Sequence, residues 1–565
     1  MTFWAKSLRV FNCLWENGTQ SVRRIAHKTG LSKSSVHRLT QAMERRGRHP
    51  ESWLWETEEG RQWLTRLVGA TLYTFGLKRG VGMDTLSEFF ARLRLETQVG
   101  CSPSALRGVM EALVDTLVET TQGWEQDGVA GGEVREIIGA VDETFLEQLI
   151  LVFQDVPTGY IVQEEVADNR TYATWKALVD ERLQALSTSV LYLVSDRAKA
   201  LIQLAEQGFK CLSMPDFFHF MHDIVKNYSL ALGRRMSQAH KALLEAQEAL
   251  ARLQGQPYAA QEAPAAQALV AMRQTEVTRW EEAHHTYRRH LETLSFTLHP
   301  FRMADAAPQT SAQVASHLLT TVAAIEVFAQ GHQLPIRHAA VTKVRKQIPA
   351  LAALVDFWWE GVRQDMAHAD LSPLWRQWAE EVLLPLVYWE HQVAHTRCAR
   401  RKAKIRQALE TMQGAFRQHA LTQCLPPQAC KEWHGWATQR VKAFQRTSSA
   451  VEGRNGYLSQ MHHNHRGLPK QRYKVWTALH NFDCHAADGT TPASRFFMRT
   501  FPDLFETVLS TIDDLPRPRK RNQAMALTPM GKPPPLAVRR AEALPFQRGT
   551  IQISGQHVKR EESRI

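Results

Sequence analysis

The stretch from Arg135 to Phe220 constrains the fold of this 565-residue chain more than any other segment. It contains five short apolar runs, and helix-like segments separate the later ones. A Pro/Gly turn at 155–159 joins the second and third runs and predicts a β-hairpin. The predicted order is β-β-β-α-β-α-β, a three-strand meander followed by a parallel crossover. The runs are 137–141, 149–153, 160–166, 190–194 and 210–214.

Two aspartates stand at the ends of predicted strands. Asp142 ends the first run, and Asp196 follows the fourth, whose continuous apolar character predicts a strand buried on both faces. In a mixed sheet of this order the first and fourth strands are neighbours, so both carboxylates would point at one spot. Two carboxylates this close repel each other unless a divalent cation lies between them. Such a site needs a third acidic ligand from elsewhere in the chain.

Glu452 is the candidate for this third acid. It lies in the segment RTSSAVEGRN, where Ser448 or Ser449 can cap a helix that carries Glu452 in its first turn. Arg454 and Asn455 follow on the same helix, and a basic cluster comes next. A phosphate backbone approaching the acids would favour such cations. The cluster comprises His462, His463, His465, Arg466, Lys470, Arg472 and Lys474.

The motifs VDET, VSDR and SSAVEGRN, which contain the three acids, resemble those of DDE transposases with a ribonuclease-H-like fold. The resemblance implies that Asp142, Asp196 and Glu452 hold two Mg²⁺ (or Mn²⁺) ions, about 3.5–4 Å apart as in other two-metal sites. It also implies a homodimer on double-stranded DNA, with the element's terminal repeats and the target DNA as partners. The gap between Asp196 and Glu452 is longer than in the simplest pattern, and the Tyr-Arg-Glu-Lys signature of one branch is absent, so the exact family stays open.

Two further side chains are expected beside the acids. His219 follows the last predicted strand, which leaves the sheet at the same edge as Asp196, so it can reach the site. Asn455 stands one helical turn after Glu452. Arg454, Arg466, Lys470 and Arg472 are the expected DNA contacts of this region.

The N-terminal residues 1–60 predict a helix-turn-helix. Gly30 can take the positive φ that ends a helix, and Ser32 can cap the next one. Val36 and Leu39 would form the buried face of this second helix, and its exposed face would meet phosphates or base edges in a major groove. An ordinary helical hairpin is the alternative. The expected DNA contacts are Lys33, Ser34, Ser35, His37 and Arg38.

The remaining segments complete an expected fold that is mostly helical. It combines an α/β ribonuclease-H-like catalytic domain (a mixed sheet) with the N-terminal helix-turn-helix and a large all-α insertion. The expected divisions are 61–132 (helical, with a possible second helix-turn-helix and a glycine-rich linker from residue 122), 133–222 (first part of the catalytic domain), 223–445 (all-α insertion), 446–512 (last part of the catalytic domain, with the third acid) and 513–565 (basic disordered tail).

Charge and composition fit a nucleic-acid partner. The formal net charge is +12, and the residues from Pro516 onward contribute eleven Lys/Arg against three Asp/Glu. The sequence has no apolar run of membrane-spanning length and no signal-peptide pattern, so we expect no membrane partner and a cytoplasmic, nucleoid-associated protein. The seven scattered cysteines predict free thiols.

These observations predict a DNA transposase that binds the ends of its element and carries out metal-dependent strand cleavage and strand transfer. Two alternatives stay open. One is a nuclease on the same fold that cuts without strand transfer. The other is a DNA-binding regulator or domesticated relative whose acid site is inactive.

Overall fold

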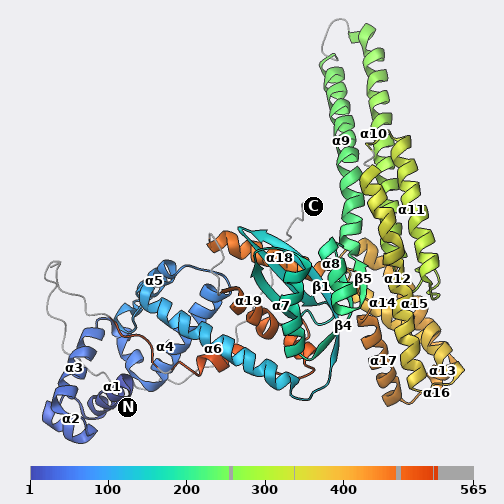
Figure 1. Cartoon of the computed structure of the whole chain (residues 1–565). Coiled ribbons are helices and arrows are strands. Elements are labelled where there is room, and N and C mark those ends of the chain that lie inside the picture. The colour runs from blue at the N-terminus through green and yellow to red at the C-terminus, as the bar shows by residue number, and fades with distance from the viewer. Residues whose placement is uncertain (1, 254–258, 336–337, 466–471, 513, 519–565) are drawn as a thin grey trace. The chain divides into compact units, whose positions relative to one another are not determined.

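The computed structural model describes residues 2–253, 259–335, 338–465, 472–512 and 514–518 (Figure 1). This part of the chain is mostly helical and contains one small mixed sheet. The residues from Arg519 onward, which include most of the predicted basic tail, lie outside the described part.

The N-terminal helix-turn-helix is present as predicted. Gly30 ends α2 with a φ of 68°, and Ser32 Oγ accepts a hydrogen bond from the Ser35 N–H at 3.2 Å at the start of α3. Val36 and Leu39 pack into a small separate core with residues of the two preceding helices. The helices are α1 (Phe3–Asn17), α2 (Val22–Thr29) and α3 (Lys33–Arg46).

A helical region follows, and one of its predicted features is wrong. The glycine-rich stretch from residue 122 was expected to be a linker, but α6 continues to Val129. Gly128 is required there by packing, because a Cβ atom at this position would lie 2.4 Å from the ring of Phe497. Ser102 caps α6 and Pro103 opens it, while a second helix-turn-helix in this region stays a prediction. The helices are α4 (Glu58–Thr71), α5 (Met83–Arg92) and α6 (Pro103–Val129), with shorter helical turns η1 (Pro50–Glu56), η2 (Leu72–Leu77) and η3 (Leu95–Thr97).

The five-stranded sheet has the predicted element order. Its strands lie in the order β3-β2-β1-β4-β5, with β1, β2 and β3 antiparallel and β4 parallel to both β1 and β5. The prediction that the first and fourth strands lie side by side is therefore confirmed. The elements are β1 (Arg135–Leu146), β2 (Gln148–Asp155), β3 (Ile161–Ala167), α7 (Tyr172–Ala185), β4 (Thr188–Ser195), α8 (Lys199–Gln203), η4 (Leu204–Phe209) and β5 (Leu212–Pro215).

The first strand is longer than its apolar run. Asp142 was expected at the end of this strand, yet β1 runs on to Leu146 because its pairing with β2 continues past Asp142. The parallel pairing with β4 stops earlier, at Ala140 opposite Val194. Asp142 and Asp196 thus each lie two residues beyond the last parallel pair, at the edge where β4 ends.

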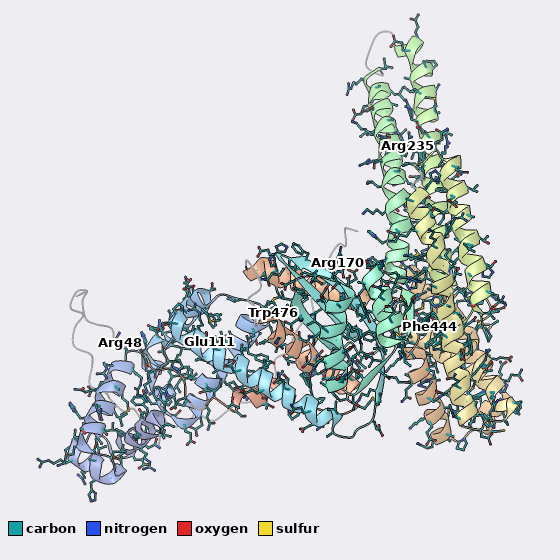
Figure 2. All side chains as sticks on the ribbon, viewed as in Figure 1. Arg48, Glu111, Arg170, Arg235, Phe444 and Trp476 are labelled. Atoms are coloured by element: carbon teal, nitrogen blue, oxygen red, sulfur yellow. The ribbon has the colours of Figure 1, made fainter. Side chains whose placement is uncertain are left out.

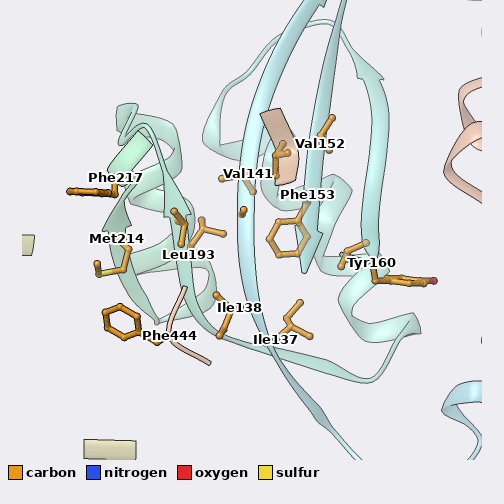
Figure 3. Close-up of a cluster of buried hydrophobic side chains, with 14 of the residues drawn as sticks. Ile137, Ile138, Val141, Val152, Phe153, Tyr160, Leu193, Met214, Phe217 and Phe444 are labelled. Carbon is orange, nitrogen blue, oxygen red and sulfur yellow. The ribbon is translucent and has the colours of Figure 1, made fainter. Parts of the chain in front are cut away.

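Buried aliphatic and aromatic side chains fill both faces of the sheet (Figure 3). Gly139 sits at the centre of β1, where an added Cβ atom would lie 2.5 Å from the ring of Phe153. Phe444, labelled in Figure 2, extends this core toward the helical insertion, because its ring also packs against Trp358 and Tyr388. The sheet and the insertion therefore share one apolar core.

The insertion between β5 and residue 446 is helical in its described part, as predicted, apart from an isolated bridge between Phe301 and Pro308. α9 and α10 pack along each other as a helical hairpin (Figure 1). α11 is long and apolar enough to span a membrane, but it packs Val314, Leu318 and other residues into the helical core. The helices are α9 (Phe217–Leu253), α10 (Ala259–Thr297), α11 (Ser311–Gly331), α12 (His338–His368), α13 (Pro373–Trp378), η5 (Ala379–Leu383), α14 (Leu384–His395), α15 (Ala399–Gln418), α16 (Ala420–Cys424) and α17 (Pro427–Lys442).

The chain returns to the sheet after the insertion. α18 packs against β1 and β2, and α19 packs against β3 and α6. The last described residues lie beside the loop before α6, where the Gly100 N–H donates to the Pro516 carbonyl at 2.6 Å. The helices are α18 (Ser449–His465), α19 (Arg472–Asp483), α20 (Pro492–Phe496) and α21 (Leu504–Leu509).

Candidate functional site

The structure brings the predicted acids together from three distant segments. Asp142 Oδ1 accepts a hydrogen bond from the Glu143 N–H at 2.9 Å, and its Oδ2 accepts one from Asn455 Nδ2 at 2.8 Å. Asp196 Oδ1 accepts from the Ala198 N–H at 2.8 Å. Asn455 stands on the same helix as Glu452, so α18 lays both side chains against β1.

The N-terminus of α18 is fixed by Asp216, in the turn between β5 and α9. Its buried carboxylate accepts hydrogen bonds from the Ser448 N–H (3.0 Å) and the Ser448 hydroxyl (2.8 Å). Ser448 stands directly before α18, as predicted, but its hydroxyl donates to Asp216. The position of Glu452 in the first turn of α18 therefore depends on Asp216, which lies 232 positions before its partner Ser448 in the chain.

His219 connects this anchor to Glu452. Its Nδ1–H donates to Asp216 Oδ2 at 2.6 Å, and its Nε2 lies 3.5 Å from Glu452 Oε1. The hydrogen bond with Asp216 raises the pKa of His219 to about 9, with further support from the charges of Asp216, Glu452 and Asp142. Burial raises the pKa of Asp216, but the hydrogen bonds that it accepts outweigh burial and hold it below the ordinary range. An imidazolium thus stands beside the acids at neutral pH.

The pKa of Asp142 depends on the other groups of the site. It is raised to about 6, chiefly by burial; the charges of Glu452 and Asp196 also raise it, whereas the hydrogen bond from the Glu143 N–H and the charge of His219 lower it. All three predicted acids and His219 therefore share one electrostatic environment. A cation that neutralised these acids would relieve their mutual repulsion.

The donor set suits a hard cation. Carboxylates are the ligands that Mg²⁺ prefers, and the buried Oδ1 of Asn455 has no hydrogen-bond partner among the described residues. No three His, Cys, Asp or Glu side chains within the described ranges are arranged as a ready-made metal cage. The chemistry of the residues fits divalent cations at Asp142, Asp196 and Glu452.

The predicted DNA contacts of the helix-turn-helix face outward. Lys33, Ser34, His37 and Arg38 are exposed on α3, and Ser35 is half-buried. Arg38 is held along the helix by a hydrogen bond from its Nε to the Ser34 carbonyl at 3.3 Å. The exposed side chains of this face are placed as those of a helix that enters a groove of DNA.

The predicted DNA contact at Arg454 requires a correction. Arg454 is 4% exposed, and its guanidinium donates to both carboxylate oxygens of Glu164 on β3, at 2.6 and 2.8 Å. It fastens α18 to the sheet and does not face DNA. Arg466 and Lys470 lie outside the described residues, as does the side chain of Arg472 at the start of α19.

Two residues that position α18 were not predicted from the sequence patterns. Asp216 is the anchor of α18, and its only local signal was its position three residues before His219. Glu164 was detectable as a charged residue on the apolar side of β3, between Val162 and Val166. A buried carboxylate at such a position needs a cationic partner.

Comparisons with known proteins identify two regions of the chain. Residues 5–47 match an IclR helix-turn-helix domain, so the chain carries a DNA-binding domain of this type. Residues 379–524 match a family of unknown function (DUF6399), and this region includes the end of the helical insertion and all of α18. No curated protein matches the chain.

Proposed function

We propose that this protein is a DDE-type DNA transposase that cleaves and joins DNA strands with divalent cations held by Asp142, Asp196 and Glu452. The observation that carries the proposal is the convergence of these three acids, from β1, the end of β4 and α18, into one electrostatic environment. Segments so far apart in the chain have no local reason to meet. Their meeting at a strand edge supports a site for cations and phosphates.

The sheet order supports the same proposal. A meander of three antiparallel strands with two further parallel strands beside the first is the arrangement that the resemblance to ribonuclease-H-like enzymes requires. The first and third acids lie on adjacent elements, because α18 packs directly against β1. The helix-turn-helix supplies DNA binding, which a transposase needs to locate the ends of its element.

Each side chain has a proposed role. Asp142, Asp196 and Glu452 hold Mg²⁺ or Mn²⁺, which supplies activation of the attacking oxygen and charge stabilisation of the leaving oxygen. Asn455 orients the Asp142 carboxylate through its 2.8 Å hydrogen bond. Asp216 holds the Nδ1 proton of His219, so that Nε2 faces Glu452 and the approaching phosphate. The exposed side chains of α3 bind the element ends.

The test uses a donor plasmid that carries the gene with its native flanking DNA. Excision and new insertion are compared for the wild type and for Asp142→Asn, Asp196→Asn and Glu452→Gln. Asp168→Asn is the matched control, because Asp168 is an exposed acid just beyond β3. We expect events in the wild type and the control only. Events in the three site variants would show that other residues do the chemistry.

Binding and cleavage by purified protein separate the proposal from its alternatives. Asp196→Asn should abolish cleavage and leave binding to the flanking DNA unchanged, because binding is assigned to α3. Cleavage of the element ends without joining to a target would favour the nuclease. Binding without any Mg²⁺-dependent cleavage by the wild type would favour the DNA-binding regulator.

A further inference from the structure

A dense group of cations marks the beginning of α15. The stretch 397–406 contains six Lys/Arg and no Asp or Glu. Five of the six side chains are exposed, and Lys402 is half-buried. We call this group the α15 basic face, and its members are Arg397, Arg400, Arg401, Lys402, Lys404 and Arg406.

Partners within the chain account for only part of this charge. Arg400 and Lys404 both pair with Glu292 of α10, at 3.3 and 2.7 Å. Arg401 donates to the neutral Ser295 hydroxyl at 3.4 Å. In the described part of the chain, the other three cations of the face form no ion pair. Among the described residues these six cations meet a single acid, Glu292, so most of their positive charge is available to attract an external anion.

Helix electrostatics does not explain the cations either. The first turn of α15 contains Arg400, Arg401 and Lys402 and no acidic residue. The helix dipole favours acids at this end and cations at the other end, so the placement weakens the helix. Packing explains only the buried Ile405 and Met412 of α15, and the cations flank Ile405 on both sides. A solvated surface selected for helix stability would carry the reverse charge.

The α15 basic face is connected to the acidic site by a short series of contacts. Ser295, which Arg401 contacts, also accepts at its carbonyl from Arg446 Nη1 at 3.0 Å. The Arg446 carbonyl accepts from the Phe217 N–H at 2.9 Å, two residues before His219. The matched region 379–524 contains both α15 and Glu452. These contacts link the end of α10, which the basic face touches, to the start of α9, which carries His219.

We propose that the α15 basic face is a second DNA-contact surface, which binds the phosphate backbone of duplex DNA independently of sequence. The helix-turn-helix makes duplex DNA the polyanion that this chain meets. Long flexible cations without a rigid base-reading arrangement position a backbone and do not specify a sequence. The inference depends on DNA binding by the chain, and it does not depend on the proposed catalysis.

The test measures binding of the full chain to a random-sequence DNA duplex across a salt series, in EDTA. The variant replaces Arg397, Lys402 and Arg406 by Gln, because these three cations have no ion pair to lose among the described residues. Each lost phosphate contact reduces the magnitude of the negative slope of log K against log salt by about 0.9, so we expect the magnitude to decrease by about 2–3. The matched control replaces three exposed cations on other helices of the insertion by Gln: Arg234, Lys346 and Lys431.

The outcomes are distinguishable. An unchanged slope in the variant would overturn the proposal, and so would an equal decrease in the control, which would mean a general charge effect. Weaker binding to duplex RNA with unchanged binding to DNA would overturn the choice of partner. Circular dichroism checks that each variant keeps its helices. Because EDTA removes the cations, a failure of the transposition assay does not affect this measurement.

Discussion

The buried ion pair between Arg454 and Glu164 should hold α18 in its position against the sheet. Its side chains are 3% and 0% exposed, and two hydrogen bonds of 2.6 and 2.8 Å join them. Removing one partner leaves a buried charge without compensation, which costs about 3–5 kcal/mol. We therefore expect Arg454→Met and Glu164→Met each to destabilise the contact of α18 with β3 by this amount.

The double variant separates charge from packing. Two methionines fill the space without leaving a charge, so Arg454→Met/Glu164→Met should be far less destabilised than the sum of the single variants. The exposed pair Arg92–Glu88 on α5 is the control, and Arg92→Met should change stability by no more than about 1 kcal/mol.

Hydrogen exchange of the α18 amides is the suitable assay, because a chain with several regions does not unfold in one step. A loss of about 3 kcal/mol corresponds to roughly a hundredfold faster exchange or more. Under the proposed function, the single variants should also lose strand cleavage, since α18 carries Glu452. Unchanged exchange in both single variants would refute the argument that this pair holds α18. If the destabilisation of the double variant equalled the sum of the two single variants, the assignment of the effect to an unpaired charge would be refuted.

Three further predictions follow from other parts of the chain. Burial raises the pKa of Asp155 to about 6, so the folded state binds more protons than the unfolded state between about pH 4 and 6. The free energy of unfolding should therefore fall by up to about 3 kcal/mol as the pH rises through this window. Asp155→Asn should flatten this pH dependence, as measured in urea titrations. Gly128→Ala should destabilise α6 by about 1–3 kcal/mol, because the added methyl group clashes with Phe497. Gly123, in the same helix, has open space around it, so Gly123→Ala should stabilise α6 by about 0.5–1 kcal/mol. Thermal unfolding of the two variants compares these effects. Arg38→Ala on α3 should weaken binding to the DNA that flanks the gene by about 1–3 kcal/mol in a titration at fixed salt, and unchanged binding would remove Arg38 from the DNA interface.

Local patterns in the sequence were enough to predict the order of the strands. Each strand is a short apolar run, and the turn at 155–159 produces the expected hairpin between β2 and β3. The end of β1 was not predictable in the same way, because Asp142 interrupts the apolar run while backbone pairing with β2 continues to Leu146. Hydrophobicity reports burial, and strand pairing extends beyond the buried part.

Non-local partners explain the errors. Gly128 is typical of a linker in sequence, yet its contact with Phe497 makes it the residue that lets a helix pack closely. Arg454 follows Glu452 in a polar segment typical of a DNA-facing surface, and only Glu164, 290 positions earlier, places it in the core. Asp216 has the same character, since its main partner Ser448 belongs to the other end of the insertion. Such pairs leave no periodic signal in the sequence.

The same non-local contacts account for the long gap between Asp196 and Glu452. The helical insertion leaves the sheet at Phe217 and returns at Arg446, and the Phe217 N–H donates to the Arg446 carbonyl at 2.9 Å. Next to this bond, Asp216 accepts both hydrogen bonds from Ser448. The two ends of the insertion are therefore joined at its base, and because the entropy of closing a loop grows only slowly with its length, a long insertion adds little cost at this point. The spacing between the second and third acids in the sequence thus does not limit their approach in space, and the closure at the base of the insertion places Glu452 beside His219.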